Sequence, residues 1–468
     1  MILLFGRKLL ESIFMESHFF SFKKETLSPP ERTEGIEYIL KVCDEYKMNV
    51  YTSLMAIEFF DLLSFKMKEK DTVPFVCVYL AFLFRGSENQ NFLNGPECIK
   101  YEEELSSLCF EVVASFKGPI FRPTAMRCLS LFLQRNCTSF EENMILLGYL
   151  KQKVTSCQEI CELVSPLLPE EKRVSFSTFV ENEIKQTSSK PFYRKYSPGK
   201  RICCLGEGAH AKVYCCLEDE TTKIYTAVKV YNIGEGEELN ALREIALLSS
   251  VSHPSIVPFF GWSFEPKDQK VYLYLGQGYR VPPHDLSEKW IQQYGYEILQ
   301  AIDYLHQRGF VHRDLKRTNV VYSDDKKHVW LIDFGISREE QAHGMSAKMA
   351  PQILMPPEMI ENLDYDASID IWQLGLFFAG SITKDESFPS ALTDTDLTYQ
   401  LFYFKNNLLI HENSYRPTYR LSNIVNPTLR DFIARCLTDY YLQRPKSHEL
   451  LSHPFFKSSI PERSLKDI

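Results

Sequence analysis

Two short runs in the second half of the chain carry residues that together can do phosphate chemistry. The first run contains Asp314 and Asn319, and the second, Asp333–Gly335, begins fourteen residues after Asn319. A carboxylate such as Asp314 can accept the proton of an attacking hydroxyl group. The oxygens of Asn319 and Asp333 are ligands of the kind that magnesium prefers. Phosphoryl transfer requires a base and metal-holding oxygens in such an arrangement.

A glycine-containing run and a lysine farther upstream are suited to holding phosphate groups. Gly206–Val213 lies between two strand-like runs, and its glycines, Gly206 and Gly208, let backbone amides approach phosphate oxygens closely. Lys229 follows Gly208 by 21 residues within an apolar, strand-like run. Such a lysine needs a carboxylate partner to keep its position, and we predict Glu244, on a helix, as that partner. The alternative for Lys229 is an ordinary surface lysine, which its apolar neighbours disfavour. The alternative for Glu244 is a solvated helix glutamate.

These runs resemble the catalytic and nucleotide-binding motifs of eukaryotic-type protein kinases, over about residues 196–457. The resemblance implies a two-lobed α+β fold, ATP and Mg²⁺ as cofactors, and protein substrates. The order of strands followed by helices from about Glu288 agrees with that fold. The lysine at position 316 resembles serine/threonine-specific kinases and argues against tyrosine specificity. The resemblance assigns catalysis to Asp314, Lys316, Lys229 and Glu244, and metal binding to Asn319 and Asp333.

The same resemblance implies where adenine and the nucleotide phosphates bind. Leu275 corresponds to the gatekeeper and Gly276–Gly278 to the hinge, whose two glycines suggest a flexible segment. Farther along, Glu358 and Arg444 are expected to form a buried ion pair. The implied nucleotide-binding set is Leu205, Gly206, Gly208, Val213, Ala227, Lys229, Leu275, Gln277 and Gly278.

Composition and charge narrow the remaining function classes. A length of 468 residues leaves room for a further domain beside a kinase fold, and the net charge of −8 gives no support to a nucleic-acid or membrane partner. The 13 cysteines are scattered without the spacing of a zinc site, which favours reduced thiols. No window reaches the roughly 18 uncharged apolar residues of a membrane helix. We therefore expect an intracellular protein, in the cytoplasm or nucleus.

The chain divides near residue 190. Before this point apolar residues recur at three- and four-residue spacing, as in Ile36, Ile39 and Cys43, which predicts helices almost throughout. A polar, basic stretch then predicts a linker. The expected organisation is an N-terminal helix and lead-in over 1–30, an all-α domain over 31–184, a linker over 185–196, the kinase domain over 197–457 and a tail over 458–468.

The N-terminal helical region resembles a cyclin box. Arg32, Tyr38, Tyr46–Met48, Thr52, Ala56–Ile57 and Phe59–Asp61 have the spacing of its first two helices. The run Ala241–Ile245 in turn resembles the helix of cyclin-dependent kinases that a cyclin holds inward. Together these resemblances imply an all-α cyclin-like domain that contacts the helix around Glu244 within the same chain, through Arg85 and Glu103. An unrelated helical regulatory domain stays as the alternative, because 121–184 looks short for a second cyclin repeat.

The resemblance to cyclin-dependent kinases also suggests a regulatory serine and bears on the choice of substrate. Ser346 lies twelve residues before Glu358, where cyclin-dependent kinases carry an activating threonine. A phosphate there would face Arg313 and Arg243, because guanidinium groups suit phosphate contacts; a plain loop serine is the alternative. The family's pattern for proline-directed substrates is poorly kept, so we expect serine/threonine phosphorylation without a stated proline preference.

Two other functions stay open at this level. The first is a pseudokinase scaffold, which the presence of every catalytic residue disfavours. The second is a kinase whose N-terminal helical domain recruits substrates or partners and does not activate it.

Overall fold

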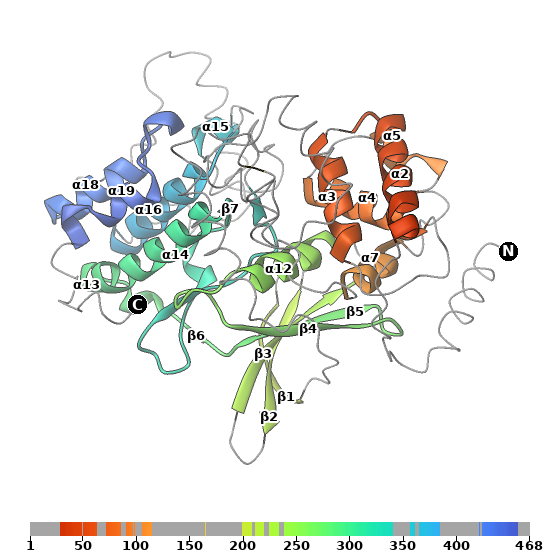
Figure 1. Cartoon of the computed structure of the whole chain (residues 1–468). Helices are drawn as coiled ribbons and strands as arrows, with labels where there is room; N and C mark the ends of the chain where they lie inside the picture. Colours follow the sequence, from red (N-terminus) through yellow and green to blue (C-terminus); the bar gives the residue numbers. More distant parts are fainter. Residues whose placement is uncertain are drawn as a thin grey trace.

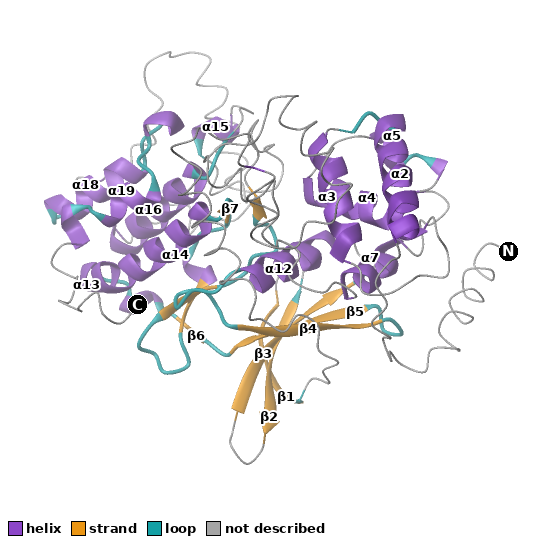
Figure 2. Cartoon of the chain, in the orientation of Figure 1, coloured by secondary structure: helices purple, strands orange, loops and turns teal. Residues whose placement is uncertain are grey.

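The computed structural model describes residues 29–48, 50–62, 72–85, 90–96, 98, 105–114, 164, 199–207, 211–219, 224–233, 238–339, 356–360, 365–383, 421 and 424–456. In Figure 1 an antiparallel sheet lies at the bottom, with the N-terminal helices on the right, the C-terminal helices on the left and α12 between them. Figure 2 shows that strands are concentrated in this sheet. The predicted linker, the C-terminal tail and nearly all of the predicted lead-in lie outside the described residues.

Every described element before residue 115 is a helix, as the periodicity predicts. Helix α4 runs through the middle of this group, and Phe75–Val78 within it is fully buried. A helix that is apolar on all sides is stable only when other elements cover it, and α2, α3 and α7 pack against α4. The ring of Phe92 closes the cluster against Tyr46, Phe75 and Phe82. The helices are α2 Pro29–Glu45, α3 Val50–Leu62, α4 Thr72–Arg85, α5 Gln90–Leu93 and α7 Leu105–Ala114.

The sheet has the strand order β1-β2-β3-β5-β4, and all its pairs are antiparallel. Strand β3 shows how the sequence suits a sheet that is covered on both faces, because successive side chains of a strand point to opposite faces. Val228 and Val230 pack with Tyr274 on one face, whereas Lys229 and Tyr231 point to the other face, toward α12. The strands are β1 Lys200–Glu207, β2 Lys212–Asp219, β3 Ile224–Asn232, β4 Phe259–Glu265 and β5 Lys270–Gly276.

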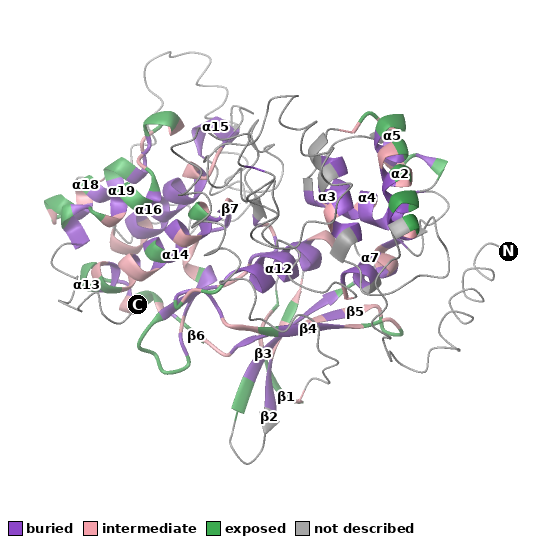
Figure 3. Cartoon of the chain, in the orientation of Figure 1, coloured by how far each residue is buried: buried purple, intermediate pink, exposed green. Residues whose placement is uncertain are grey.

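Helix α12, Glu238–Ser250, is buried almost along its whole length (Figure 3). Every residue from Asn240 to Ser250 is buried, including the charged pair Arg243 and Glu244. Strands β3 and β4 contact one side of the helix, and α4 of the N-terminal group also contacts it. The sheet alone covers only one side of a helix, so burial on every side requires further covering elements.

The C-terminal group is mainly helical and carries a small sheet of order β6-β8-β9. The predicted pair of Glu358 and Arg444 is confirmed: the guanidinium makes two hydrogen bonds to the carboxylate, at 2.8 and 3.1 Å, and both side chains are buried. None of the described helices is long and apolar enough to cross a membrane. The elements are β6 Tyr279–Arg280, α13 Glu288–Trp290, a π-helical turn Ile291–Gly295, α14 Tyr296–Gln307, β7 Phe310–Val311, β8 Val320–Tyr322, β9 Val329–Leu331, β10 Arg338–Glu339, α15 Pro357–Ile360, α16 Ser368–Thr383, α18 Pro427–Cys436 and α19 Ser447–Leu451.

Candidate active site

The loop after β7, which carries the first predicted motif, is held in place by two buried polar side chains of α16. Asp370 accepts hydrogen bonds from the backbone N–H groups of His312 and Arg313, both at 2.8 Å. Gln373 accepts one from the Leu315 N–H and donates one to the Arg313 carbonyl. Because all four bonds connect to the loop backbone, α16 determines the path of the loop.

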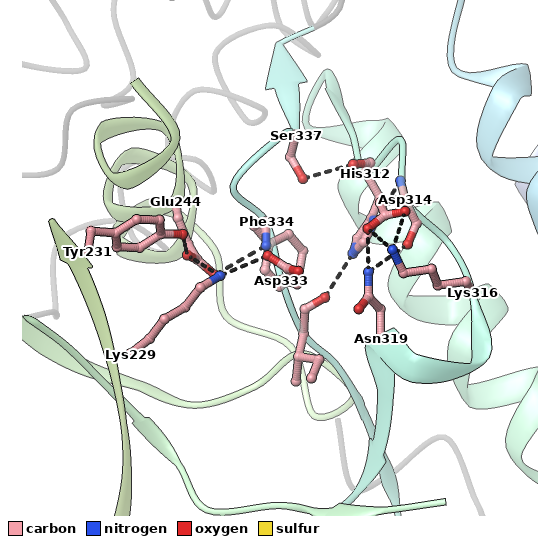
Figure 4. Close-up of polar contacts among 11 residues, drawn as sticks. Lys229, Tyr231, Glu244, His312, Asp314, Lys316, Asn319, Asp333, Phe334 and Ser337 are labelled. Atoms are coloured by element: carbon pink, nitrogen blue, oxygen red, sulfur yellow. Dashed lines mark hydrogen bonds and ion pairs between the residues drawn. The ribbon is translucent and has the colours of Figure 1, made fainter. Parts of the chain in front are cut away.

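Asp314 lies at the centre of this loop, next to Lys316 and Asn319 (Figure 4). The Lys316 ammonium donates to both carboxylate oxygens, at 2.9 and 2.7 Å. The Asn319 amide nitrogen donates to the carbonyl and to the carboxylate of Asp314. Burial raises the pKa of Asp314 above its ordinary value, and the Lys316 charge opposes this rise. The carboxylate is thus oriented by two neighbours and has an increased tendency to take up a proton.

Asp333 lies opposite this loop, on the turn after β9. Its backbone has φ 66, in the left-handed region that non-glycine residues rarely adopt. Its carboxylate accepts a hydrogen bond of 2.8 Å from Lys229, and the Lys229 charge lowers the pKa of Asp333 to about 2. Asp333 is therefore ionised at neutral pH.

Lys229 pairs with Glu244 at 2.8 Å, as the spacing predicts. Burial lowers the pKa of Lys229, but Asp333 and Glu244 outweigh burial and raise it well above its ordinary value. Glu244 is fully buried, and its second oxygen accepts a hydrogen bond of 3.2 Å from the Phe334 N–H. One carboxylate of α12 therefore contacts both the strand lysine and the Asp333–Gly335 turn.

The oxygen donors in this site fit a magnesium ion. Asn319 uses its amide nitrogen on Asp314, which leaves its carbonyl oxygen for other partners. Asp333 contributes an ionised carboxylate. Carboxylate and amide oxygens are the ligands that Mg²⁺ takes together with phosphate oxygens. Asn319 and Asp333 would hold the ion, and the ion would neutralise charge on the phosphates.

The described part of the predicted phosphate-binding run lies at the end of β1 and the start of β2. Gly206 is the register partner of Val213, and Val213 is the partner of Lys229, so these three residues form one row across β1, β2 and β3. Leu205 is half-buried beside this row, and Ala227 is buried two residues before Lys229. Gly208 lies outside the described residues. The structure thus places Leu205, Gly206, Val213, Ala227 and Lys229 on three adjacent strands.

The hinge glycines occupy crowded positions. A Cβ atom on Gly276 would lie 2.9 Å from Pro258, and one on Gly278 would lie 2.6 Å from Val321. Leu275 is buried opposite Ala227, and the Gln277 amide donates to the Gly278 carbonyl. Close packing therefore accounts for both glycines, and the predicted flexibility is not needed to explain them.

The predicted regulatory residues are only partly described. Arg313 is buried at φ 72, and its guanidinium donates to the Ile336 carbonyl; burial lowers its pKa. Arg243 is also buried, next to Glu244. Ser346 and Glu103 lie outside the described residues, and Arg85 is described only as the last residue of α4. Their predicted roles stay predictions.

The reasoning from sequence missed Tyr231, and it placed Asp370 and Gln373 in a buried helix without predicting that they hold the loop around Asp314. Asp370 and Gln373 are buried polar residues inside an otherwise apolar helix, and that pattern could have signalled an anchoring role. Tyr231 lies two residues after Lys229, on the same face of β3, and its hydroxyl group bonds Glu244. The alternation of a strand was the available signal for this tyrosine.

The sequence matches the family described as protein kinase domain over residues 200–456. Three similar proteins come from Dictyostelium discoideum. Serine/threonine-protein kinase pakG is 29% identical over 277 residues, which cover 57% of this chain and 22% of pakG. Serine/threonine-protein kinase 4 homolog B is 29% identical over 55% of this chain and 23% of its own length. Serine/threonine-protein kinase dst1 is 28% identical over 56% of this chain and 35% of its own length.

The aligned region thus spans about a third or less of these three relatives. The matched residues begin at β1, so the family match does not include the helices before residue 115. Within the matched residues, a strand-rich lobe and a helical lobe bring Lys229, Asp314 and Asp333 to one site, in agreement with the expected two-lobed fold. Because the match covers more than half of the sequence, the chain belongs to the protein kinase domain family.

Proposed function

We propose that this chain is an active serine/threonine protein kinase that transfers the terminal phosphoryl group of ATP to hydroxyl groups of proteins. The observation that carries the proposal is the meeting of Asp314, Asn319, Asp333 and the Lys229–Glu244 pair in one site (Figure 4). The relatives' names, all serine/threonine-protein kinases, support the choice of hydroxyl substrate.

The proposed step assigns one task to each group. Asp314 accepts the proton of the substrate hydroxyl, whose oxygen bonds to the terminal phosphorus as the bond to the ADP oxygen breaks. Lys316, already in contact with Asp314, neutralises charge on the transferred group. Lys229, held by Glu244, binds the remaining phosphates. Positioning and charge neutralisation account for most of the catalysis in this class of reaction.

We further propose that the N-terminal helices act as a built-in activator, as in a cyclin-dependent kinase with its cyclin. A kinase is active only when its helix glutamate meets the strand lysine, and Glu244 meets Lys229 here. The support is the burial of α12 from Asn240 to Ser250 and its contact with α4. A helix covered on every side cannot move outward without breaking those contacts.

The contact of α7 with the sheet supports the same proposal. Its Phe110 ring packs on Trp262 and Phe264 of β4, with ring centroids 6.1 and 5.4 Å away. The hydroxyl of Ser107 donates to the Gln269 side chain near the turn between β4 and β5. Strand β4 itself packs against α12. The helical region is thus joined to the kinase sheet through an aromatic contact and a polar one.

Asp314→Asn tests the enzymatic proposal. The amide keeps the size of the side chain and cannot accept the proton as a carboxylate does, so phosphorylation of a basic serine/threonine peptide by purified protein should fall to background. Thermal unfolding and ATP-dependent stabilisation of the variant should stay close to those of the unchanged protein. Equal phosphorylation by both proteins would refute the assignment and point to a contaminating kinase.

A further inference from the structure

Tyr231 occupies a position from which it can influence the lysine–glutamate pair directly. It follows Lys229 by two residues on β3, so the two side chains point to the same face of the sheet. Its hydroxyl donates a hydrogen bond to Glu244 Oε2, the same oxygen that pairs with Lys229 (Figure 4). Tyr231 is 1% exposed, so this bond is shielded from water.

The same hydroxyl lies against the turn that carries Asp333. A Cβ atom on Gly335 would lie 3.2 Å from Tyr231 Oη. The neighbouring Phe334 N–H donates to the other oxygen of Glu244. Glu244 therefore receives donors from Lys229, Tyr231 and the Asp333–Gly335 turn, and the tyrosine hydroxyl lies where β3, α12 and that turn meet.

We propose that Tyr231 is a positioning residue for phosphoryl transfer, whose hydroxyl holds Glu244, and through it Lys229, in the arrangement that the reaction needs. A buried carboxylate is stabilised by each donor that it gains, and hydrogen bonds to charged groups are stronger than neutral ones. If α12 moved outward, the tyrosine hydroxyl would lose this acceptor at a buried position. The inward position of α12 is therefore favoured by an interaction from the sheet itself, in addition to the N-terminal helices.

The tyrosine can act as a donor over the whole pH range of an assay. Burial, together with the nearby Glu244 charge, raises the pKa of Tyr231 well above its ordinary value. The Lys229 ammonium opposes this rise and lies 5.2 Å from the centre of the tyrosine ring. The hydroxyl thus stays protonated while Glu244 stays its acceptor.

Tyr231→Phe in the full chain tests the proposal, because it removes the hydroxyl and leaves the ring. Tyr274→Phe is the matched control: Tyr274 is also buried in the sheet, and its hydroxyl bonds Ser263 on the face away from Glu244. Both variants lose one buried hydrogen bond, so both should unfold at a somewhat lower temperature. Only Tyr231→Phe should lower kcat/KM for ATP, by about tenfold, whereas KM for the peptide should not change.

Three results would overturn the proposal: full activity of Tyr231→Phe, equal loss of activity in both variants, or a loss limited to KM for the peptide. A second line of evidence comes from Tyr231→Phe combined with Phe110→Leu. Because Tyr231 and Phe110 act on the inward position of α12 through separate contacts, we expect the double variant to lose more activity than either single variant. The proposal rests on the proposed kinase activity, which Asp314→Asn tests with Tyr231 unchanged, so the two can fail separately.

Discussion

Phe110 of α7 and Trp262 of β4 face each other with ring centroids 6.1 Å apart and planes inclined by 56°. Both side chains are fully buried. This pair joins a helix outside the family match to a strand inside it. Since β4 packs against α12, the helix that carries Glu244, a change at Phe110 can affect the active site through one intermediate strand.

Phe110→Leu should therefore lower kinase activity without changing any catalytic group. Leucine keeps an apolar side chain but loses the ring contacts with Trp262 and Phe264. Aromatic pairs contribute about 0.5–1.5 kcal/mol beyond their buried area. This energy corresponds to about two- to tenfold in the population of the docked arrangement, in which α7 packs on β4. Steady-state rates with a basic serine/threonine peptide measure the effect.

Phe75→Leu is the matched control for this prediction. Phe75 is equally buried, but its described ring contact is with Phe92, inside the helical group. Both variants lose one buried ring, and chemical denaturation would compare their stabilities. A larger activity loss for Phe110→Leu supports docking as the activating contact. Equal activity of the Phe110 variant and the unchanged protein would favour a helical domain that recruits partners.

Much of the site could be predicted from sequence because chemistry dictates the residue types. Phosphoryl transfer needs a base, metal-holding oxygens and a paired lysine, at distances along the chain that allow them to meet in one site. For this reason the Lys229–Glu244 and Glu358–Arg444 pairs were predicted correctly although 15 and 86 residues separate their members. The helical character before residue 115 followed from apolar periodicity.

The parts that could not be predicted depend on packing between distant segments. Phe110 reads as one more apolar residue of a helix, and only the fold shows that it meets Trp262. The contacts predicted through Arg85 and Glu103 stay predictions, because the Arg85 side chain and Glu103 lie outside the described residues; the contacts that the structure describes, made by α7 and α4, were not predicted residue by residue. Two glycines in the predicted hinge suggested a flexible segment. The sequence does not reveal that Pro258 and Val321 crowd these positions.

The buried ion pair of the C-terminal lobe should be important for stability. Glu358→Gln keeps the shape of the side chain but leaves the Arg444 charge buried without a carboxylate. Breaking a buried pair from one side costs about 3–5 kcal/mol, so the free energy of unfolding should fall by that amount in chemical denaturation. The exposed pair of Arg435 and Asp431 provides a control, and Arg435→Gln should change stability by less than about 1 kcal/mol. Similar losses in both variants would show that burial does not govern the effect.

Asp370→Asn should disturb the loop after β7, which carries Asp314, more than it lowers the stability of the whole fold. The carboxylate accepts from the His312 and Arg313 N–H groups and also contacts His306, whereas an amide has only one accepting oxygen. At least one buried N–H group then loses its partner, at a cost of about 1–3 kcal/mol. We expect kcat to fall by about tenfold or more while KM for ATP changes little. A variant that unfolds at a lower temperature but keeps its kcat would contradict this role for Asp370.

Lys316→Ala should move the acid limb of the pH–rate profile to higher pH. Asp314 must be ionised to accept the substrate proton, so activity is lost as the pH falls through its pKa. Burial raises that pKa and the Lys316 charge lowers it; removing the charge leaves the effect of burial less opposed, and the pKa rises further. The profile of kcat/KM against pH measures the shift, and the overall rate should also fall. Lys327→Ala removes an exposed lysine that pairs with Asp325 and not with Asp314, so it should leave the acid limb where it is. The ionisation of ATP is the same in all these assays and cannot produce a difference between the proteins. A shift of the Lys316→Ala limb to lower pH, or no shift, would show that Asp314 is not the group whose ionisation limits the reaction.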